Sequence, residues 1–475
     1  MVFQMKRQFI AFLSIFIIFL SPIFTTASVK ATSTEEGNSW PEGPNVFAES
    51  AIVMEASTGL ILYEKNMNEV HYPASITKIM TALLAVENSN MGEVVTFSKK
   101  AVFDVDLDSS RIGIDVGEQL TMQQSLYGIL LESANEVSYA VAEHVAGSAE
   151  EFAKMMTERA KSLGCLNTNF VNPHGLHDDN HYTTAYDMAL ITREAMKNDT
   201  FRKIFATRTY QIPPTNIQPE TRYLRNHHRF ILRQDYHYDD CIGGKTGYTS
   251  KSKFTLVSVA KRGDLELICV IMRDDSNEHQ YTDTKKLFDY AFDNFSIYPI
   301  ADLESSQTLA ESPMFNRYNP LLSENSSPIT TDEKGYLVLP NTASFKDAIK
   351  EVTFYPVSEQ TTTPQNNKIV GKISYTYNGK YVGGADILYH STPSLRLNHT
   401  ESIKNNPTSA PLDSSPQKSD KSLRPVILGG IIGLFVLIII LYFVLVEAPR
   451  IKRRNAYYRK RARRRSYKED DYLDL

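Results

Sequence analysis

A serine and a lysine three positions apart, Ser75 and Lys78, stand at the start of an apolar segment. If that segment is a helix, the two side chains lie on one face about one turn apart, so the lysine amine reaches the serine hydroxyl. A serine hydroxyl becomes an effective nucleophile when a neighbouring base takes its proton, and a lysine is a base only while its amine is neutral. The pair therefore offers acyl transfer through a covalent serine ester.

The position of this pair in the chain distinguishes it from two others with the same spacing. Ser250 with Lys253 and Ser415 with Lys418 share the spacing, and an ordinary helix-capping serine followed by a solvated lysine produces it often. Only Ser75 precedes a segment that we expect to be a buried helix. Free backbone N–H groups and the helix dipole at such a start stabilise negative charge that develops nearby. Ser75 is therefore the candidate nucleophile.

Two further polar motifs follow along the chain. Ser133-Ala134-Asn135 interrupts an apolar helical pattern, where an ordinary turn is an equally good explanation. Lys245-Thr246-Gly247 occurs once, after Gly243-Gly244 and shortly before an expected strand at Phe254. The alternative explanation of this motif is an exposed strand end whose glycine allows a tight turn. Neither motif identifies a reaction by itself.

In this order the three motifs resemble the active-site motifs of penicillin-recognising serine enzymes. Longer segments resemble one branch of that group, the D-alanyl-D-alanine carboxypeptidases. Pro73 to Ala82 is similar to the nucleophile segment of that branch, and Asn172 to Leu176 with His181 to Ala189 is similar to its middle block. The resemblance covers about Ala48 to Asn294 and extends more weakly beyond it. It implies a β-lactamase/transpeptidase-like α/β (α+β) catalytic domain that releases the terminal D-alanine from peptidoglycan stem peptides.

The resemblance also implies a role for each motif. Ser75 would attack the carbonyl between the two D-alanines, and Lys78 would take its proton. Burial and a second cation at Lys245 would promote this step, because both disfavour the charged form of Lys78. Ser133 and Asn135 would relay protons and hold the substrate amide.

Further residues would hold the two ends of the scissile bond. The first two residues of Lys245-Thr246-Gly247 would bind the terminal carboxylate. The backbone N–H groups of Ser75 and Tyr248 would form the oxyanion hole. Arg225, ahead of the third motif, is a weaker candidate for the carboxylate because its spacing is loose. β-Lactams would acylate the same serine, since they present a strained amide beside a carboxylate.

Metal and disulfide chemistry find little support in the sequence. His174 and His181 have no carboxylate or cysteine at clear ligand spacing, so we interpret both as structural. The resemblance likewise implies no metal and no cofactor. Cys165, Cys241 and Cys269 are too few for a disulfide framework, although a single bridge stays open.

Three other functions stay open at this point. A secreted β-lactamase would share the acylation chemistry, and an endopeptidase that cuts D-alanyl cross-links would share the whole site. A catalytically silent wall-binding scaffold would share only the fold. Two departures from the family pattern leave rate and substrate preference open: Ala134 stands where relatives often have glycine, and Lys251 to Lys253 is unusually basic.

The expected elements place strands at both ends of the catalytic region and helices between them. Such an order predicts one sheet that unites the two ends. A four-residue pattern from Thr184 to Asp187 fits a capping box that opens a helix. We predict hairpins at 50–55 with 60–64 and 254–260 with 265–272, and helices at 75–86, 121–145 and about 280–294.

The character of the chain changes after the catalytic domain, which we place at residues 46–297. Residues 298–391 read as short strands and turns, and Asn378-Gly379 between two alternating runs is a strong hairpin signal. We therefore predict a small all-β domain there. Residues 392–424 are rich in Ser, Pro, Asn and Lys and are expected to be a disordered stalk.

Both ends of the chain have the pattern of membrane-targeting segments. Residues 1–31 have the basic, apolar and small-residue regions of a signal peptide, with an uncleaved anchor as the alternative, and a linker follows at 32–45. Residues 425–446 contain no charged side chain and predict a C-terminal transmembrane helix. The tail at 447–475 holds eleven Lys and Arg against five Asp and Glu, which predicts that it is cytoplasmic and that the catalytic domain is extracytoplasmic.

The charge balance excludes a nucleic-acid surface on the predicted ectodomain. The whole chain carries a formal net charge of −4 and the tail contributes +6, so residues 1–446 carry −10. A surface of that sign repels phosphate backbones. The basic tail is explained by membrane topology and by contact with anionic lipids.

Overall fold

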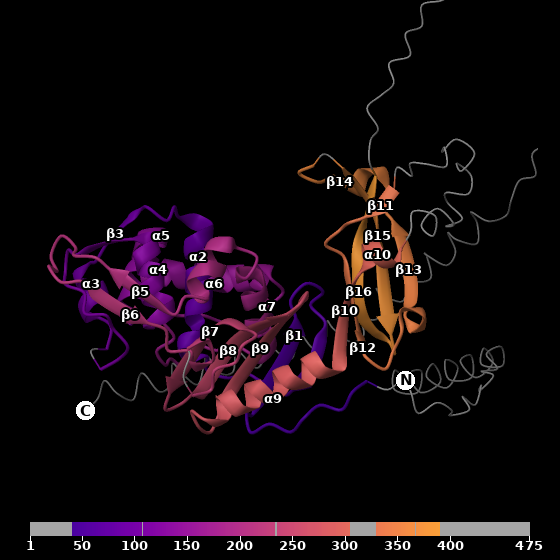
Figure 1. Cartoon of the computed structure of the whole chain (residues 1–475). Helices are drawn as coiled ribbons and strands as arrows, with labels where there is room; N and C mark the ends of the chain where they lie inside the picture. The colour runs from indigo at the N-terminus through magenta and orange to yellow at the C-terminus, as the bar shows by residue number, and fades with distance from the viewer. Residues whose placement is uncertain (1–39, 107, 233–234, 305–328, 366, 390–475) are drawn as a thin grey trace, which may run out of the picture. The chain divides into compact units, whose positions relative to one another are not determined.

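The first sheet unites the start and the end of the catalytic region, as predicted (Figure 1). The structure is a computed structural model that describes residues 40–389, apart from 107, 233–234, 305–328 and 366. The sheet is antiparallel and runs in the order β2-β1-β9-β8-β7. Its strands are β1 Ser50–Glu55, β2 Ile61–Lys65, β7 Cys241–Thr249, β8 Lys253–Arg262 and β9 Leu265–Asp274. The two predicted hairpins, β1–β2 and β8–β9, are confirmed.

Side chains of the central strand β9 alternate between two cores. Ile268 and Val270 belong to a cluster shared with most of the helices, whereas Leu267 and Cys269 belong to a cluster that includes α9 (His279–Asn294). Successive side chains of a strand point to opposite faces, so this sheet is buried on both sides. Figure 1 shows α9 against one face and α7 on the other.

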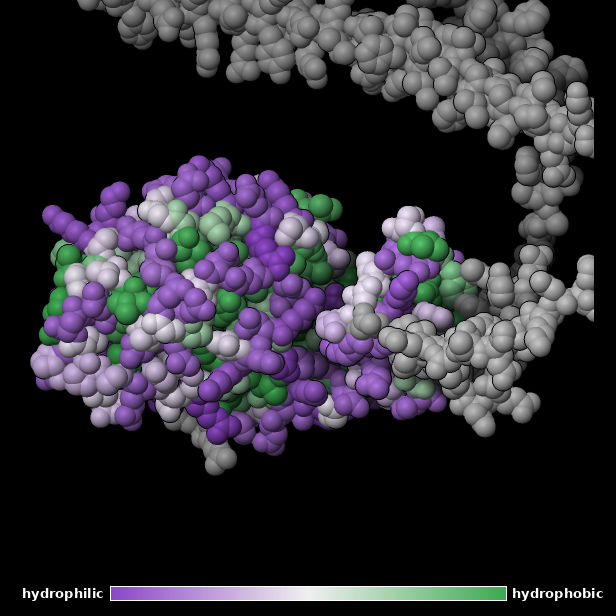
Figure 2. All heavy atoms as spheres, turned by 90° about the horizontal axis from the view of Figure 1, so that it is seen from above, coloured by the Kyte–Doolittle hydropathy of each residue, from purple (hydrophilic) through white to green (hydrophobic). Residues whose placement is uncertain are grey.

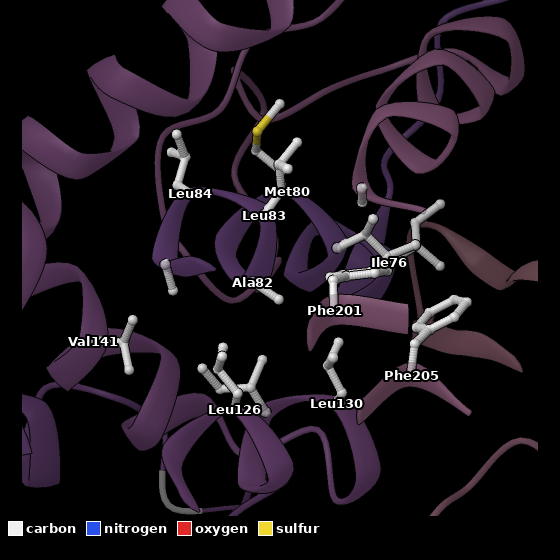
Figure 3. Close-up of a cluster of buried hydrophobic side chains, with 14 of the residues drawn as sticks. Ile76, Met80, Ala82, Leu83, Leu84, Leu126, Leu130, Val141, Phe201 and Phe205 are labelled. Atoms are coloured by element: carbon white, nitrogen blue, oxygen red, sulfur yellow. The ribbon is translucent and has the colours of Figure 1, made fainter. Parts of the chain in front are cut away.

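Between β2 and β7 the chain forms a group of helices that pack on one face of the sheet. Figure 3 shows side chains of α2 (Ala82), α4 (Leu126, Leu130) and α8 (Phe201, Phe205) on the same side of α2, within one apolar core. The helices of this group are α2 Lys78–Asn88, α3 Lys99–Phe103, α4 Met122–Leu131, α5 Asn135–Ala146, α6 Ala149–Ser162, α7 Ala185–Ala195 and α8 Asp199–Phe205. Two small hairpins accompany them, β3 Val94–Thr96 with β4 Gln119–Thr121, and β5 Thr209–Ile212 with β6 Arg222–Arg225.

The surface seen in Figure 2 mixes hydrophobic and hydrophilic residues. Hydrophobic side chains lie singly or in small groups among polar ones on this face. Single exposed apolar residues are normal for proteins in water and need no partner to explain them. The two buried clusters, and not this surface, therefore account for most of the apolar side chains that hold the fold together.

A second, seven-stranded sheet lies where the sequence predicted short strands and turns. Its main path is β10-β12-β16-β15-β13, while β11 pairs with β16 and β14 with β15. In the predicted hairpin, Asn378 and Gly379 have φ of 49° and 74°, the left-handed values that a two-residue hairpin turn requires. The sheet begins at Phe295, slightly before the predicted boundary after residue 297. Its strands are β10 Phe295–Pro299, β11 Ile329–Thr331, β12 Tyr336–Pro340, β13 Ile349–Phe354, β14 Thr361–Thr362, β15 Lys368–Tyr377 and β16 Lys380–Tyr389, with the short helix α10 Ile300–Leu303 after β10.

The single disulfide that the sequence left open is not present, because all three cysteines are free. Cys241 lies opposite Ala260 on β8, and Cys269 lies opposite Ser258 on the other edge of the same strand. Two strand spacings therefore separate these cysteines, about 10 Å, which exceeds the reach of a disulfide. Cys165 belongs to the helical core on the far side of the sheet from Cys269.

The terminal predictions fall outside the described residues. The signal peptide at 1–31, most of the linker at 32–45, the stalk at 392–424, the transmembrane helix at 425–446 and the tail at 447–475 belong to this group. Among residues 40–389, apart from the gaps given above, no helix combines the length and the hydropathy that a membrane crossing requires.

Candidate active site

The nucleophile candidate lies on a tight turn and not in the first turn of an α-helix, which corrects the predicted helix start at residue 75. A 3-10 turn spans Ala74–Thr77, and α2 begins at Lys78. Pro73 precedes this turn, and Ala74 has a φ of +51°, a left-handed value that costs energy in a residue with a side chain. Strained backbone of this kind is frequent at reactive positions. The turn leaves Ser75 half-buried at the edge of the core.

The Lys78 amine contacts residues of both the first and the second motif. Its Nζ lies 3.0 Å from Ser75 Oγ, 2.6 Å from Asn135 Oδ1 and 2.6 Å from the His174 carbonyl oxygen. The side chain is fully buried, so water does not compete for these contacts. A neutral amine in this place keeps two donated hydrogen bonds and accepts the Ser75 hydroxyl proton with its lone pair. This geometry suits a general base.

Burial and charge favour the neutral form of Lys78. Burial is the largest cause that lowers its pKa well below the usual value, and the second cause is the positive charge of Lys245. Glu136 opposes both, because its carboxylate stabilises the cation. Glu136 is itself fully buried, its Oε1 accepts a hydrogen bond from the Ile112 N–H at 2.7 Å, and burial raises its pKa. In the sequence, only its position next to Asn135 marks Glu136.

Ser133 has the backbone and the burial of a functional residue. It lies between α4 and α5 with a φ of +60°, and it is 3% exposed. Its Oγ is buried and has no hydrogen-bond partner within the described part of the chain. A buried hydroxyl without a partner is costly and therefore needs an explanation. Asn135, two residues later, is the first residue of α5 and binds Lys78, so the motif faces the same centre.

The third motif lies inside β7, the edge strand of the sheet, and the strand predicted after it at Phe254 is β8. Gly247 is the closest approach of this strand to the nucleophile turn. A Cβ there would lie 2.9 Å from the Ser75 nitrogen and 3.1 Å from the Pro73 oxygen. Thr255 on β8 also donates a hydrogen bond to the Pro73 oxygen, at 2.8 Å. Only glycine at position 247 therefore lets the strand and the turn meet.

Lys245 is a second buried amine. It is 2% exposed, its Nζ donates to the Thr246 carbonyl at 2.8 Å, and burial lowers its pKa to about 7. A cation buried with so little compensation gains from a bound carboxylate. After the motif, the Tyr248 side chain is exposed and leans on the Phe254 ring, with the centroids 4.6 Å apart.

The weaker candidate, Arg225, contacts the site through its backbone. Its N–H donates to Glu132 Oε1 at 2.6 Å, beside Ser133, and its side chain is exposed at the end of β6. His227 Nε2 pairs with Glu132 Oε2 at 3.0 Å. These contacts connect β6 and the segment after it to the second motif, and they do not involve the Arg225 guanidinium.

The loop at residues 172–181 supplies a group that the sequence did not identify. The His174 carbonyl holds Lys78, as described above, while the imidazole of His181 contacts Thr77 Oγ1 at 2.9 Å and accepts the Val171 N–H. Burial is the main cause that lowers the pKa of both histidines, to about 3 for His181, so both rings are neutral. A backbone carbonyl leaves no trace in residue type, which is why only the structure reveals it.

Gly175 is expected to be irreplaceable. Its φ is +85°, and a Cβ would lie 1.9 Å from the Ala74 oxygen and 2.8 Å from Thr77 Oγ1. The backbone that carries the nucleophile would have to move, so Gly175→Ala is expected to lower the free energy of unfolding by about 3 kcal/mol and the acylation rate by at least about 100-fold. Urea unfolding and single-turnover acylation measure the two effects.

Gly147→Ala is the matched control for this prediction. Gly147 has a similar φ of +81° at the end of α5, but nothing lies within 4 Å of its Cβ position. It should therefore lose only the cost of the left-handed backbone, about 1 kcal/mol, and keep the acylation rate. Equal effects at both positions would mean that the contact with Ala74 is unimportant.

Comparisons with known proteins point to the same family as the three motifs. Residues 37–276, just over half of the chain, match the model of a family described as D-alanyl-D-alanine carboxypeptidase. The D-alanyl-D-alanine carboxypeptidase DacF of Bacillus subtilis is 36% identical over 266 residues, which cover 56% of this chain and 66% of that protein. DacA of Haemophilus influenzae is 26% identical over 382 residues, which cover 78% of this chain and 91% of that protein.

Two solved structures share the fold. The Streptomyces K15 DD-transpeptidase aligns with a TM-score of 0.50 at 29% identity and covers 53% of this chain and all of its own. Penicillin-binding protein 5 of Haemophilus influenzae aligns with a TM-score of 0.56 at 23% identity and covers 74% of this chain and 98% of its own. The second alignment therefore extends well beyond the length of chain that the first covers.

Proposed function

The chain belongs to the D-alanyl-D-alanine carboxypeptidase family, and from this premise we propose that Ser75 and Lys78 carry out its reaction, the release of the terminal D-alanine from peptidoglycan stem peptides. The observation that carries the assignment is the Lys78 amine, which is buried and bound at once to Ser75, Asn135 and the His174 carbonyl. No other lysine among the described residues is both fully buried and in contact with a serine hydroxyl.

In the acylation step the Ser75 oxygen attacks the carbonyl carbon between the two D-alanines while Lys78 takes the hydroxyl proton. The resulting oxyanion is held by the N–H groups of Ser75 and Tyr248, which the close approach at Gly247 brings together. The C–N bond then breaks, and the departing D-alanine amine receives a proton relayed through Ser133. The products of this step are free D-alanine and a serine ester of the shortened peptide.

In the second step water hydrolyses the ester. Lys78, neutral again after the relay, takes a proton from a water molecule while the oxygen of that water attacks the ester carbonyl carbon. The C–O bond to Ser75 breaks and the serine oxygen recovers its proton. One peptide bond and one water are consumed, and the enzyme returns to its starting state.

The edge strand β7 and Lys245 orient the substrate. An extended peptide pairs with an exposed strand edge through its backbone groups. The substrate's terminal carboxylate then lies beside Lys245 and Thr246, where it stabilises the buried cation. Arg225, whose backbone N–H binds Glu132 beside Ser133, is a secondary candidate for this carboxylate.

The proposed site also bears on the other functions that the sequence left open. β-Lactams acylate Ser75 because the site recognises an amide beside a carboxylate, and members of this family are penicillin-binding proteins. Fast deacylation would make the protein a β-lactamase, and acceptance of cross-linked stems would make it an endopeptidase. A silent scaffold would not need a buried lysine held in contact with a strained serine turn.

The test is D-alanine release by the full chain in detergent, with a capped pentapeptide that ends in D-Ala-D-Ala as substrate. Stoichiometric D-alanine with a shortened peptide is the expected result. Release from a cross-linked dimer but not from the pentapeptide would identify an endopeptidase instead, and turnover of penicillin faster than of peptide would identify a β-lactamase.

The pH profile tests the roles of the two lysines. Lys78 must be neutral, so kcat/KM rises as pH increases through its lowered pKa. Lys245 must be charged to hold the carboxylate, so kcat/KM falls as pH increases through about 7. In Lys245→Arg the cation persists at all accessible pH values, and the alkaline limb is expected to move up by at least about two pH units.

The exposed Lys261 on β8 provides the control for the pH experiment. Lys261→Arg makes the same exchange on the same hairpin and should leave both limbs where they are in the parent. An alkaline limb that stays near 7 in Lys245→Arg would assign it to another group.

The location of the protein is part of the proposal. The charge and hydropathy patterns support a cleaved signal peptide at 1–31, a membrane helix at 425–446 and a cytoplasmic tail at 447–475, with the catalytic domain outside the cytoplasmic membrane. Protease added to intact cells from which the wall has been removed should digest the catalytic domain and spare the tail. A protected catalytic domain would contradict this topology.

A further inference from the structure

A pocket of about 170 Å³ lies beside the proposed catalytic centre. Its polar lining comes from Tyr72, Asp179, Tyr182, Ser252 and Arg273. Each of the three segments that build the catalytic centre contributes to it. Tyr72 precedes the nucleophile by three residues, Ser252 follows Tyr248 by four, and Asp179 lies on the loop whose His174 carbonyl holds the base. The pocket therefore adjoins the place where a substrate must lie.

The positive side of this pocket is Arg273, the residue before the end of β9. Its φ is +55°, its Nε binds Glu49 Oε1 at 2.8 Å, and its Nη1 donates to the Lys251 carbonyl at 3.4 Å. The side chain keeps 39% of its surface exposed, so the guanidinium still has donors to offer. The basic stretch from Lys251 to Lys253, which the family resemblance did not explain, lies at the same turn.

The negative side of the pocket is Asp179. Its side chain is 87% exposed and is held loosely, by His177 Nε2 at 3.3 Å and by the Tyr72 hydroxyl at 3.4 Å. His71, also in the lining, is not a second cation, because burial lowers its pKa. The pocket thus presents a cation and an anion from two different segments, and neither has a fully buried partner that would satisfy it.

The orientation of the substrate determines which of its groups reaches this pocket. The terminal carboxylate lies beside Lys245, and the scissile carbonyl lies at the N–H of Tyr248, three residues further along β7. The earlier residues of the stem peptide therefore continue toward the turn after Thr249. An extended chain advances about 3.3 Å per residue, so the residue before the two D-alanines lies within about 7 Å of the reacting carbonyl, next to Ser252.

We propose that this pocket binds the side-chain end of the residue that precedes the two D-alanines, and that it selects a side chain ending in both an ammonium and a carboxylate group. Arg273 would bind the carboxylate and Asp179 the ammonium, while the Ser252 hydroxyl is buried and engaged in the turn between β7 and β8. A side chain with only one of these charges lacks the second charge-assisted contact, so its peptide binds more weakly. This inference rests on the proposed function and names its substrate class.

The test compares four acetylated tripeptides X-D-Ala-D-Ala with the full chain in detergent. X is diaminopimelate with both end groups, lysine with the ammonium alone, 2-aminopimelate with the carboxylate alone, or Nε-acetyl-lysine with neither. We expect kcat/KM for the diaminopimelate peptide to exceed that for acetyl-lysine by at least about 10-fold, the effect of one charge-assisted hydrogen bond at a partly exposed site. The single-charge peptides should fall between them.

Two variants assign the preference to its residues. Arg273→Gln should reduce the ratio between the diaminopimelate and lysine peptides to within about 2-fold, and Asp179→Asn should do the same for the diaminopimelate and aminopimelate peptides. Arg273→Lys keeps the charge and should restore most of the preference, which separates recognition from a folding defect. Arg262→Gln is the matched control, because Arg262 is an equally exposed arginine at the opposite end of the β8–β9 hairpin, paired with Asp240, and it should preserve every ratio.

The possible outcomes distinguish failure of the pocket assignment from failure of the proposed carboxypeptidase function. Release from all four peptides at equal rates, or a preference that survives in Arg273→Gln and Asp179→Asn, overturns the pocket assignment and leaves the carboxypeptidase intact. Absence of release from all four peptides by the folded parent overturns the proposed function and the pocket assignment together. A preference for the carboxylate alone, lost only in Arg273→Gln, overturns the role of Asp179.

Discussion

Ser75→Ala is expected to reduce D-alanine release by at least about 10⁴-fold and to leave the fold unchanged. The Ser75 hydroxyl provides the oxygen of the ester intermediate, and no neighbouring group replaces it, because Lys78 and Asn135 carry an amine and an amide and the Ser133 hydroxyl is buried. Ser75 is half-buried, so loss of one oxygen leaves no large cavity. The measurements are D-alanine release and covalent labelling with a fluorescent penicillin, and both should disappear together.

Ser250→Ala is the matched control for the nucleophile. Ser250 is followed by a lysine at the same spacing, but it is exposed in the turn between β7 and β8 and does not begin a helix. Its variant should keep both release and labelling. Penicillin labelling that persists in Ser75→Ala would show that another residue forms the acyl-enzyme.

Lys78→Gln is expected to lower the acylation rate by about 10³-fold to 10⁴-fold, the range typical of losing a general base. Glutamine fills much of the same volume and can still contact Asn135 and the His174 carbonyl, but its amide cannot accept the serine proton. Lys78→Arg should be equally inactive, since a guanidinium stays protonated at any accessible pH. Stopped-flow acylation by a chromogenic β-lactam across pH 5 to 10 measures the loss.

The shape of the pH profile distinguishes a base from a merely structural lysine. If Lys78 acts as the base, the residual rate of Lys78→Gln loses the acidic limb, because the group that titrates there is gone. Lys197→Gln, which removes an exposed ion pair with Glu194 on the surface, should change neither the rate nor the profile. An acidic limb that persists in Lys78→Gln would assign that limb to a different residue.

The sequence predicted those parts of the site and fold that depend on local spacing. Ser75 and Lys78 are neighbours on one turn in any helix-like backbone, so their contact followed from three positions of separation. Asn378-Gly379 determined its hairpin for a similar reason, because few other residues adopt the left-handed backbone of that turn. The sheet that joins both ends of the catalytic region also followed from the order of its elements.

Other features depend on contacts between distant segments and left no local signal. The base is held by a carbonyl 96 positions away, and the Gly175 contact with Ala74 depends on how a loop packs on a turn. The predicted capping box at Thr184 forms only one of its two hydrogen bonds, because a distant segment competes for the second group. Thr184 caps α7, but the Asp187 carboxylate is drawn instead to the Asn167 N–H and the Thr168 hydroxyl.

The antiparallel sheet also has a consequence for the order of events while the chain is being made. β1 lies between β2 and β9, and the edge strand that carries Lys245 is added through β8, so the nucleophile and the carboxylate-binding lysine meet only after about half of the chain has been synthesised. Contacts of such sequence separation form slowly, because the intervening loop must close first. A nascent or truncated chain that lacks β7 to β9 therefore contains Ser75 and Lys78 but no oxyanion hole, and it remains unreactive toward penicillin until the last strands of the sheet pair.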